Sequence, residues 1–242
     1  MNKLEYQNIF RNEESHFFYI STHNLVLNFI KKYSPKKNLK ILDAGCGTGL
    51  LVKKMAKFGS VYGVDMSSEA IKFCKKRDLR NIKKTSINKL PFKKNSFDII
   101  TCIDVLYHKQ VDDIKALKEI NRVLKPNGVL ILKNPAFEFL KGHHDLIVYT
   151  NKRYHYKQIV ALLKQSGFNI ERVTYAFIFL FPIVLIKRIL EPFMKNYSSD
   201  IDRVPTSLNK LLIILQNIEA KILDFINLPF GVSIYVVARK KV

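Results

Sequence analysis

The segment Ile41–Leu50 carries the residue types in this sequence that are best suited to chemistry. It reads Ile-Leu-Asp-Ala-Gly-Cys-Gly-Thr-Gly-Leu, an apolar strand that ends in an acid and passes through three glycines toward a helix. Glycine has no Cβ and tolerates positive φ, so a ligand can lie against bare backbone there. The N–H groups at the start of a helix lack partners within it and point at the turn. This layout is typical of a nucleotide site at the edge of a parallel sheet.

The spacing of the glycines indicates which kind of nucleotide. A dinucleotide turn reads Gly-x-Gly-x-x-Gly, whereas Gly45, Gly47 and Gly49 follow an acid as Gly-x-Gly-x-Gly. The turn resembles motif I of the class I S-adenosylmethionine-dependent methyltransferases, where it holds the methionine end of the cofactor. The resemblance implies S-adenosyl-L-methionine as cofactor, contacted by Asp43, Gly45, Cys46, Gly47 and Gly49. Taken alone, such a turn could also simply close an α/β unit.

A second acid lies at the distance expected for a ribose contact. Val61–Asp65 reads as a short strand that ends 22 residues after Asp43. Nucleotide-binding α/β folds place a ribose-binding carboxylate about 20 residues beyond the glycine turn. We expect Asp65 to accept hydrogen bonds from both ribose hydroxyls and Met66 to lie on the adenine face. The alternative is that Asp65 only caps the turn before the next helix.

Apolar strands and helical patterns alternate around these two acids. The predicted strands are Leu39–Asp43, Val61–Asp65, Asn81–Ser86, Phe97–Cys102, Val129–Lys133 and Ile234–Arg239. The predicted helices are Glu13–Lys32, Gly49–Phe58, Ser67–Arg77, Asp112–Leu124 and Tyr154–Ser166. This alternation indicates a parallel sheet with helices on both faces. Together with the resemblance, it predicts an α/β, Rossmann-like, doubly wound, mostly parallel seven-stranded sheet, with helical additions at the N-terminus and before the last strand.

Further motifs extend the resemblance. Three stretches are similar to the small-molecule branch of this superfamily: Leu90–Phe92 with Ser96–Asp98, Cys102–His108, and Asn121–Gly128. The resemblance implies that Ser86, Ile87 and Cys102 also contact the cofactor, with Ser86 replacing an acidic residue near adenine. A narrower group, associated with cell-surface polysaccharide or lipid-linked sugar pathways, is similar in the flanking stretches Glu14–Tyr19, Pro135–Phe137, His144–Asp145 and Arg153–Tyr154.

The resemblance covers nearly the whole chain and predicts one methyltransferase domain over residues 1–242. Its expected parts are a helical cap (1–36), a cofactor-binding core (37–174), an apolar helical insertion (175–230) and the last strand (231–242). As a helix, the apolar run Ala176–Ile186 would be about 16 Å long, too short for the ~30 Å core of a bilayer; its first part could instead be a strand. Apolar residues recur at helical spacing from Leu208 to Phe225. The insertion is either a buried cap over the site or an interfacial patch that contacts an anionic membrane.

Methyl transfer places few chemical demands on the protein, because the cofactor carries an activated group. The protein must align donor and acceptor and exclude water, and it needs a general base only for an acceptor such as a hydroxyl. The candidate catalytic residues are His108, His144 and Asp145, since a carboxylate can orient or charge an imidazole. The structural alternatives are a capping role for His108 and a loop anchor for the pair. Asp104 could contact the acceptor or the amino group of the cofactor.

Composition leaves other kinds of protein open. The net charge is +21, but only nine of the 41 basic residues are arginine, the residue that forked contacts to phosphates and bases favour. We expect a methyltransferase that acts on a small-molecule, sugar or lipid-linked acceptor in cell-envelope polysaccharide or lipid metabolism. The alternatives are an RNA methyltransferase or RNA-binding protein, and a non-catalytic scaffold of the same fold. The sequence leaves the oligomeric state open.

Cysteine spacing and the N-terminal residues bear on metals and location. Cys46, Cys74 and Cys102 show no metal-ligand spacing, so no metal is predicted. The first residues lack the apolar segment of a signal peptide. We expect a cytoplasmic protein, in contact with the inner face of the membrane if the insertion is interfacial.

Overall fold

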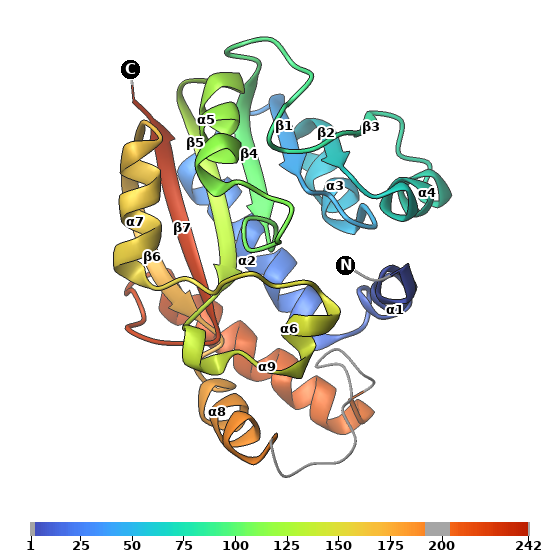
Figure 1. The fold of residues 1–242 in the computed structure, drawn as a ribbon, viewed down its shortest axis with the longest axis vertical. Coiled ribbons are helices and arrows are strands. Elements are labelled where there is room, and N and C mark those ends of the chain that lie inside the picture. The colour runs from blue at the N-terminus through green and yellow to red at the C-terminus, as the bar shows by residue number, and fades with distance from the viewer. Residues whose placement is uncertain (1–2, 192–203, 242) are drawn as a thin grey trace.

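Parallel pairing around one central strand sets the architecture (Figure 1). The computed structural model describes residues 3–191 and 204–241. Within them the strands are β1 (Leu39–Ala44), β2 (Gly59–Asp65), β3 (Ile82–Lys84), β4 (Phe97–Ile103), β5 (Leu124–Pro135), β6 (Phe168–Ala176) and β7 (Ser233–Lys240). They form one sheet in the order β3-β2-β1-β4-β5-β7-β6, parallel except that β7 runs antiparallel between β5 and β6. The predicted Rossmann-like, mostly parallel seven-stranded sheet is confirmed.

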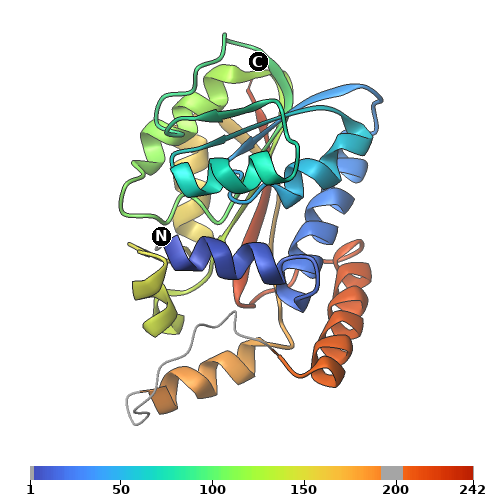
Figure 2. The same ribbon diagram turned by 90° about the vertical axis from the view of Figure 1, so that its right-hand side faces the viewer.

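Helices cover both faces of this sheet (Figures 1 and 2). One face packs against α2 (Phe17–Tyr33), α3 (Leu50–Met55) and α9 (Thr206–Leu223), and the other against α5 (Asp113–Val123) and α7 (Tyr156–Gln165). The remaining described helices are α1 (Lys3–Asn12), α4 (Ser68–Lys76), α6 (His143–Ile147) and α8 (Phe181–Leu190), with 3₁₀ turns at Ala56–Phe58 and Glu138–Leu140.

The central strands supply both cores, because successive side chains point to opposite faces. In β5, Leu130 and Leu132 pack with α5 and α7, whereas Val129 and Ile131 pack with α2 and α3. All four side chains are buried. A strand covered on both faces needs a continuous apolar sequence rather than an alternating one, which is the pattern that Val129–Lys133 shows before its final lysine.

The strand order creates a crevice at one edge of the sheet. From β1 the sheet continues to β2 on one side and to β4 on the other, so the connections that leave β1 and β4 diverge. Open α/β sheets bind their ligands at such a switch point, beyond the carboxyl ends of the strands. Asp43, Asp65 and Asp104 lie in or directly after the ends of β1, β2 and β4. The fold therefore gathers these three acids at the crevice.

Two segments differ from the sequence predictions. The helix predicted over Glu13–Lys32 begins at Phe17, because the His16 side chain caps it by accepting a hydrogen bond from the Phe18 N–H, 3.3 Å away. The run Ala176–Ile186 is not one helix: Ala176 ends β6, and α8 begins at Phe181 with a proline in its first turn. Proline suits that position because its missing N–H would have no helical partner there. Helices α1 and α6 and strand β6 have no counterpart among the predicted elements.

The insertion is anchored to the sheet by one face of α9. The buried residues of this helix recur at helical spacing: Leu212, Gln216, Glu219 and Leu223. The Glu219 carboxylate accepts hydrogen bonds from the N–H groups of Phe177 and Ile178, where the chain leaves β6. At the other end of α9, Asn209 accepts a hydrogen bond of 2.9 Å from the Phe17 N–H at the start of α2. One face of α9 is therefore docked, as the cap hypothesis requires.

Asp43 gives stability a predicted dependence on pH. Its buried carboxyl accepts a hydrogen bond of 2.7 Å from the Thr101 hydroxyl on β4. Burial raises its pKa to about 7, so protonation favours the folded state. The resulting stabilisation is complete below about pH 4, the ordinary pKa of an unfolded aspartate, and is lost as pH rises through 7. Asp43→Asn cannot titrate at this position. Between pH 4 and 7 the free energy of unfolding of the parent chain should therefore fall by at least about 1 kcal/mol more than that of the variant. Urea unfolding of both chains across this range measures the difference, and parallel curves would contradict the assignment.

Candidate active site

The turn between β1 and α3 leaves its backbone bare toward a cavity. Gly45, Gly47 and Gly49 have φ values of 91°, 53° and 87°, a region that L side chains rarely adopt. A Cβ on Gly47 would meet no atom within 4 Å, so this residue faces open space. A Cβ on Gly45 would lie 2.3 Å from Val105, and one on Gly49 would lie 2.5 Å from Leu79. Gly47 thus exposes backbone to a ligand, while the other two allow close packing of neighbouring elements.

Asp65 reaches the same turn from the end of β2. Its Oδ2 accepts a hydrogen bond of 3.0 Å from the Gly47 N–H, and its Oδ1 accepts one of 2.8 Å from the Ser67 N–H. Burial raises the pKa of this carboxyl, and the two N–H groups oppose that effect. A carboxylate can accept about four hydrogen bonds. Asp65 therefore keeps capacity for two ligand hydroxyls on its cavity side.

One cavity of about 1100 Å³ connects the glycine turn with the C-terminal insertion. Pockets for a single drug-sized ligand occupy about 300–1,000 Å³, so this volume has room for a second molecule. We call the part of the cavity lined by the glycine turn, Asp65 and Ile87 its cofactor end. The acceptor end is lined by the apolar side chains Leu180, Val184 and Leu212.

Most residues predicted to bind the cofactor line this cavity: Asp43, Gly45, Cys46, Gly47, Asp65, Met66, Ser86 and Ile87. Two do not. Gly49 lies at the start of α3 and packs against α4. Cys102 is fully buried in the core with α5 and α7, because strand alternation sends its side chain to the opposite face from Ile103, which lines the cavity. The predicted contact of Cys102 with the cofactor stays a prediction, and its side chain does not line this cavity.

The predicted catalytic residues lie in different settings. His108 lines the cavity, and burial lowers its pKa to about 4, so its imidazole is neutral near pH 7 and can accept a proton. Asp145 also lines the cavity, but both of its oxygens bind the Arg153 guanidinium, at 3.1 and 2.9 Å, and Oδ2 also accepts a hydrogen bond from the Gly142 N–H. These bonds agree with the loop-anchor alternative. The structure does not describe the side chain of His144, so its predicted pairing with Asp145 stays a prediction.

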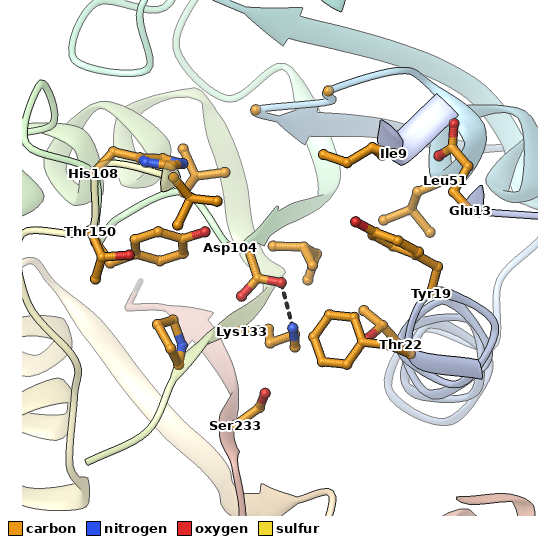
Figure 3. Close-up of a pocket in the computed structure, with 18 of the residues that line it drawn as sticks. Ile9, Glu13, Tyr19, Thr22, Leu51, Asp104, His108, Lys133, Thr150 and Ser233 are labelled. Carbon is orange, nitrogen blue, oxygen red and sulfur yellow. Dashed lines mark hydrogen bonds and ion pairs between the residues drawn. The ribbon is translucent and has the colours of Figure 1, made fainter. Parts of the chain in front are cut away.

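Sequence reasoning missed a lysine in the cavity wall. Lys133 is 1% exposed, and its ammonium forms an ion pair with Asp104, the interaction drawn as a dashed line in Figure 3. The Lys133 Nζ also lies 4.4 Å from the centre of the Phe18 ring. The available signal was a charged residue at the end of an otherwise apolar central strand. Such a residue is rarely buried unless it is paired.

The N-terminal helices close over the glycine turn through a second missed residue, Glu13. Its carboxylate accepts hydrogen bonds from the Thr48 hydroxyl at 2.5 Å and from the Arg77 guanidinium at 2.9 Å. Burial raises the pKa of Glu13. Figure 3 shows Glu13 and Tyr19 on the wall opposite Asp104. The turn between α1 and α2 is therefore tied to the turn between β1 and α3, which lies more than 30 residues away in the sequence.

Comparison with known proteins supports the interpretation of the cavity as the site of a methyltransferase. Residues 42–132 match the methyltransferase domain family. A ubiquinone/menaquinone biosynthesis C-methyltransferase from Wigglesworthia glossinidia brevipalpis is 31% identical over 155 residues, which cover 54% of this chain and 62% of that protein. A demethylmenaquinone methyltransferase from Staphylococcus aureus is 36% identical over 110 residues, which cover 42% of this chain and 45% of that protein. The chain thus spans less than two thirds of the length of these curated relatives.

Solved structures share the fold over most of the chain. A putative sarcosine dimethylglycine methyltransferase from Galdieria sulphuraria superposes with a TM-score of 0.60 at 20% identity, covering 92% of this chain and 86% of that one. A Haemonchus contortus phosphoethanolamine N-methyltransferase 2, in complex with S-adenosyl-L-methionine, gives a TM-score of 0.58 at 21% identity, covering 90% of this chain and 53% of that one.

The cofactor of this family is S-adenosylmethionine, and the cofactor end of the cavity fits it. The open side of Gly47 leaves room for a ligand against the backbone. The free lone pairs of Asp65 suit two ribose hydroxyls, and Met66 offers an apolar surface, 44% exposed, for a base. The residues at this end thus supply a partner for each part of a nucleoside ligand. Residues 42–132 are therefore similar to the methyltransferase domain family, and they lie within a fold and a cavity that suit S-adenosylmethionine.

Proposed function

We propose that this chain transfers the methyl group of S-adenosylmethionine to a lipid-linked small molecule, including sugars carried on a lipid. The observation that carries the proposal is the single cavity that joins the cofactor end to an apolar acceptor end. The names of the curated relatives, which refer to ubiquinone and menaquinone biosynthesis, support a small-molecule acceptor with apolar character. The proposal places this reaction in cell-envelope polysaccharide or lipid metabolism, on the cytoplasmic side of a membrane.

The roles of the chain in this reaction are to bind, align and exclude water. The cofactor, when bound, supplies a methyl group activated by its sulfonium. Asp65 and Gly47 would hold its ribose end against the turn, and Glu13 would keep the N-terminal helices closed over it. Closure excludes water and holds the reacting groups in line. His108 remains a candidate general base for a hydroxyl acceptor, and Asp145 would position its loop through Arg153.

The ribose assignment predicts that Asp65→Ala weakens binding of S-adenosylmethionine at least tenfold. The reason is the loss of two hydrogen bonds to a charged acceptor, each worth about 1.5–3 kcal/mol. Titration calorimetry measures the affinity. Glu69→Ala, a carboxylate on α4 outside the cavity lining, is the matched control and should bind as the parent does. Equal affinities in all three proteins would remove Asp65 from the ribose site.

The chemical class of the acceptor can be determined by finding which fraction of a cell extract receives the labelled methyl group. We expect protein incubated with cell extract and methyl-labelled S-adenosylmethionine to place most of the label in the lipid and lipid-linked fraction. Asp65→Ala, at a cofactor concentration near the parent's Kd, should place several-fold less label there. Label in nuclease-sensitive material would favour RNA methylation instead, and binding of the cofactor without transfer to any fraction would favour a scaffold.

The exposed face of the insertion supports contact with a membrane surface. Away from the docked face of α9, large apolar side chains are at least 36% exposed: Leu211, Ile214, Ile218 and Ile222. On α8 the exposed apolar residues are Ile183, Ile186, Ile189 and Leu190. Both helices lie beyond the carboxyl ends of the parallel strands (Figures 1 and 2). The chain carries a net charge of +21, which would attract anionic lipids. None of the described helices has the length and apolarity that crossing a membrane requires.

We expect the protein to sediment with vesicles that contain phosphatidylglycerol, and to bind them less as salt rises. The double variant Ile214→Asn/Ile218→Asn should lose binding several-fold, because it removes apolar area from the contact. Leu4→Asn/Tyr156→Asn changes two residues of similar exposure on α1 and α7, outside the insertion, and should bind as the parent does. Absence of parent binding at low salt, or equal losses in both double variants, would count against the membrane contact.

A further inference from the structure

The ion pair between Lys133 and Asp104 stands at the junction of the two ends of the cavity. Lys133 belongs to β5 and Asp104 follows β4, and both side chains line the cavity. Figure 3 shows them between the wall of His108 and Thr150 and the wall of Tyr19 and Thr22. A ligand that spans the cavity from the glycine turn toward the insertion would pass this pair.

Asp104 is the more exposed member of the ion pair. The Lys133 side chain is 1% exposed, whereas that of Asp104 is 28% exposed. Phe18 and Phe177 cover the ammonium, with Nζ 4.4 and 6.0 Å from the ring centres. Asp104 has a φ of 57°, a left-handed conformation that aspartate tolerates better than most residues. The turn thus directs the Asp104 carboxylate into the cavity, beside an ammonium whose position is fixed by burial.

Stability alone gives a weak reason for this arrangement. Taking two charges out of water costs several kcal/mol for each ion, and replacing such a pair with apolar residues is often neutral or stabilising. Burial accordingly lowers the pKa of Lys133, while Asp104 opposes the effect. A third polar group faces the same space, because the Tyr19 hydroxyl is buried and has no hydrogen-bond partner among the described residues. Polar groups gathered in an apolar cavity commonly fix the orientation of a ligand.

We propose that Asp104 and Lys133 receive an acidic hydroxyl group of the methyl acceptor, such as that of a phenol or enol. The inference rests on the proposed function and deepens it by naming the acceptor chemistry. The hydroxyl oxygen lies against the pair, its proton moves to the Asp104 carboxylate, and the oxygen keeps the electron pair of the O–H bond. The Lys133 ammonium stabilises the oxyanion that remains. That oxyanion, or a carbon conjugated with it, is the nucleophile.

The other candidate groups fit this role less well. Asp145 is occupied by Arg153 through both of its oxygens. His108 is neutral near pH 7, so it can take a proton but offers no positive charge to an oxyanion. Titratable side chains from several neighbouring elements interact electrostatically with the pair: Tyr19, His23, Cys102, Tyr107, His108, Arg153 and Tyr235. Asp145 and Arg153 form a second carboxylate–cation pair in the cavity wall, but that carboxylate is 3% exposed, whereas the Asp104 carboxylate is 28% exposed beside its cation.

The test uses 4-nitrophenol, whose phenolate is coloured, bound to protein saturated with S-adenosylhomocysteine. At a pH just below the pKa of the free probe, we expect at least about tenfold more phenolate relative to phenol in the bound probe, since a cation within 4–6 Å lowers the pKa of an acid by one or more. Lys133→Met should abolish the excess. Asp104→Asn leaves the cation uncompensated and should increase it. Lys109→Met removes an exposed lysine from the cavity rim and should change nothing.

A control for folding and a control for cofactor binding make the result decisive. If Lys133→Met fails to fold, the double variant Asp104→Asn/Lys133→Met removes both charges and should likewise abolish the excess phenolate. Absence of saturable probe binding, an unchanged phenolate fraction in the parent, or equal effects of Lys133→Met and Lys109→Met would each overturn the inference. Calorimetry with S-adenosylmethionine separates the two levels, because a parent chain that binds no cofactor contradicts the proposed function itself.

Discussion

The parallel register of β1 with β2 and β4 is the constraint on which the rest of the site depends. It brings the ends of three strands to one edge, so acids far apart in the sequence reach the same cavity. Each acid then takes its character from its surroundings: Asp43 is buried against Thr101, Asp65 is held by backbone N–H groups, and Asp104 is paired with Lys133. The sheet supplies the positions, and local hydrogen bonding decides what each carboxyl can do.

The cofactor end and the acceptor end are built by different means. The first uses backbone, because bare glycine and oriented N–H groups are needed where a ligand approaches the main chain. The second uses apolar side chains from α8 and α9, which are themselves held by buried polar contacts such as that of Glu219 with the turn after β6. A docked face and an exposed apolar face on one helix allow the insertion to be fixed to the protein while its outer surface stays available.

The sequence predicted the sheet well, because the sheet depends on local patterns, and most of the residues assigned to cofactor binding line the cavity. The glycine spacing, the acid at the end of β2 and the apolar central strands each carry a periodic or positional signal. The hydrogen bonds of Glu13 and the ion pair of Lys133 join residues that only the folded chain brings together, and only Lys133 carried a signal, as a charged residue at the end of an apolar central strand. Cys102 lies in the core and not in the cavity lining, because a motif fixes a residue in the sequence but not the face of the strand on which it lies. β6 was missed because its polar residues interrupt the apolar pattern.

The position of β7 has a consequence for how the chain folds during synthesis. This strand lies between β5 and β6, so residues 233–240 must join the sheet in its interior rather than at its edge. Until the ribosome has released that segment, β5 carries an unpaired edge, and β6, although α7 packs on it, has no neighbouring strand with which to pair. An open edge is a template for pairing with other chains, and long-range pairing is slow to form. A growing chain of this protein is therefore exposed to aggregation until residue 240 has emerged, a period in which chaperones would matter most.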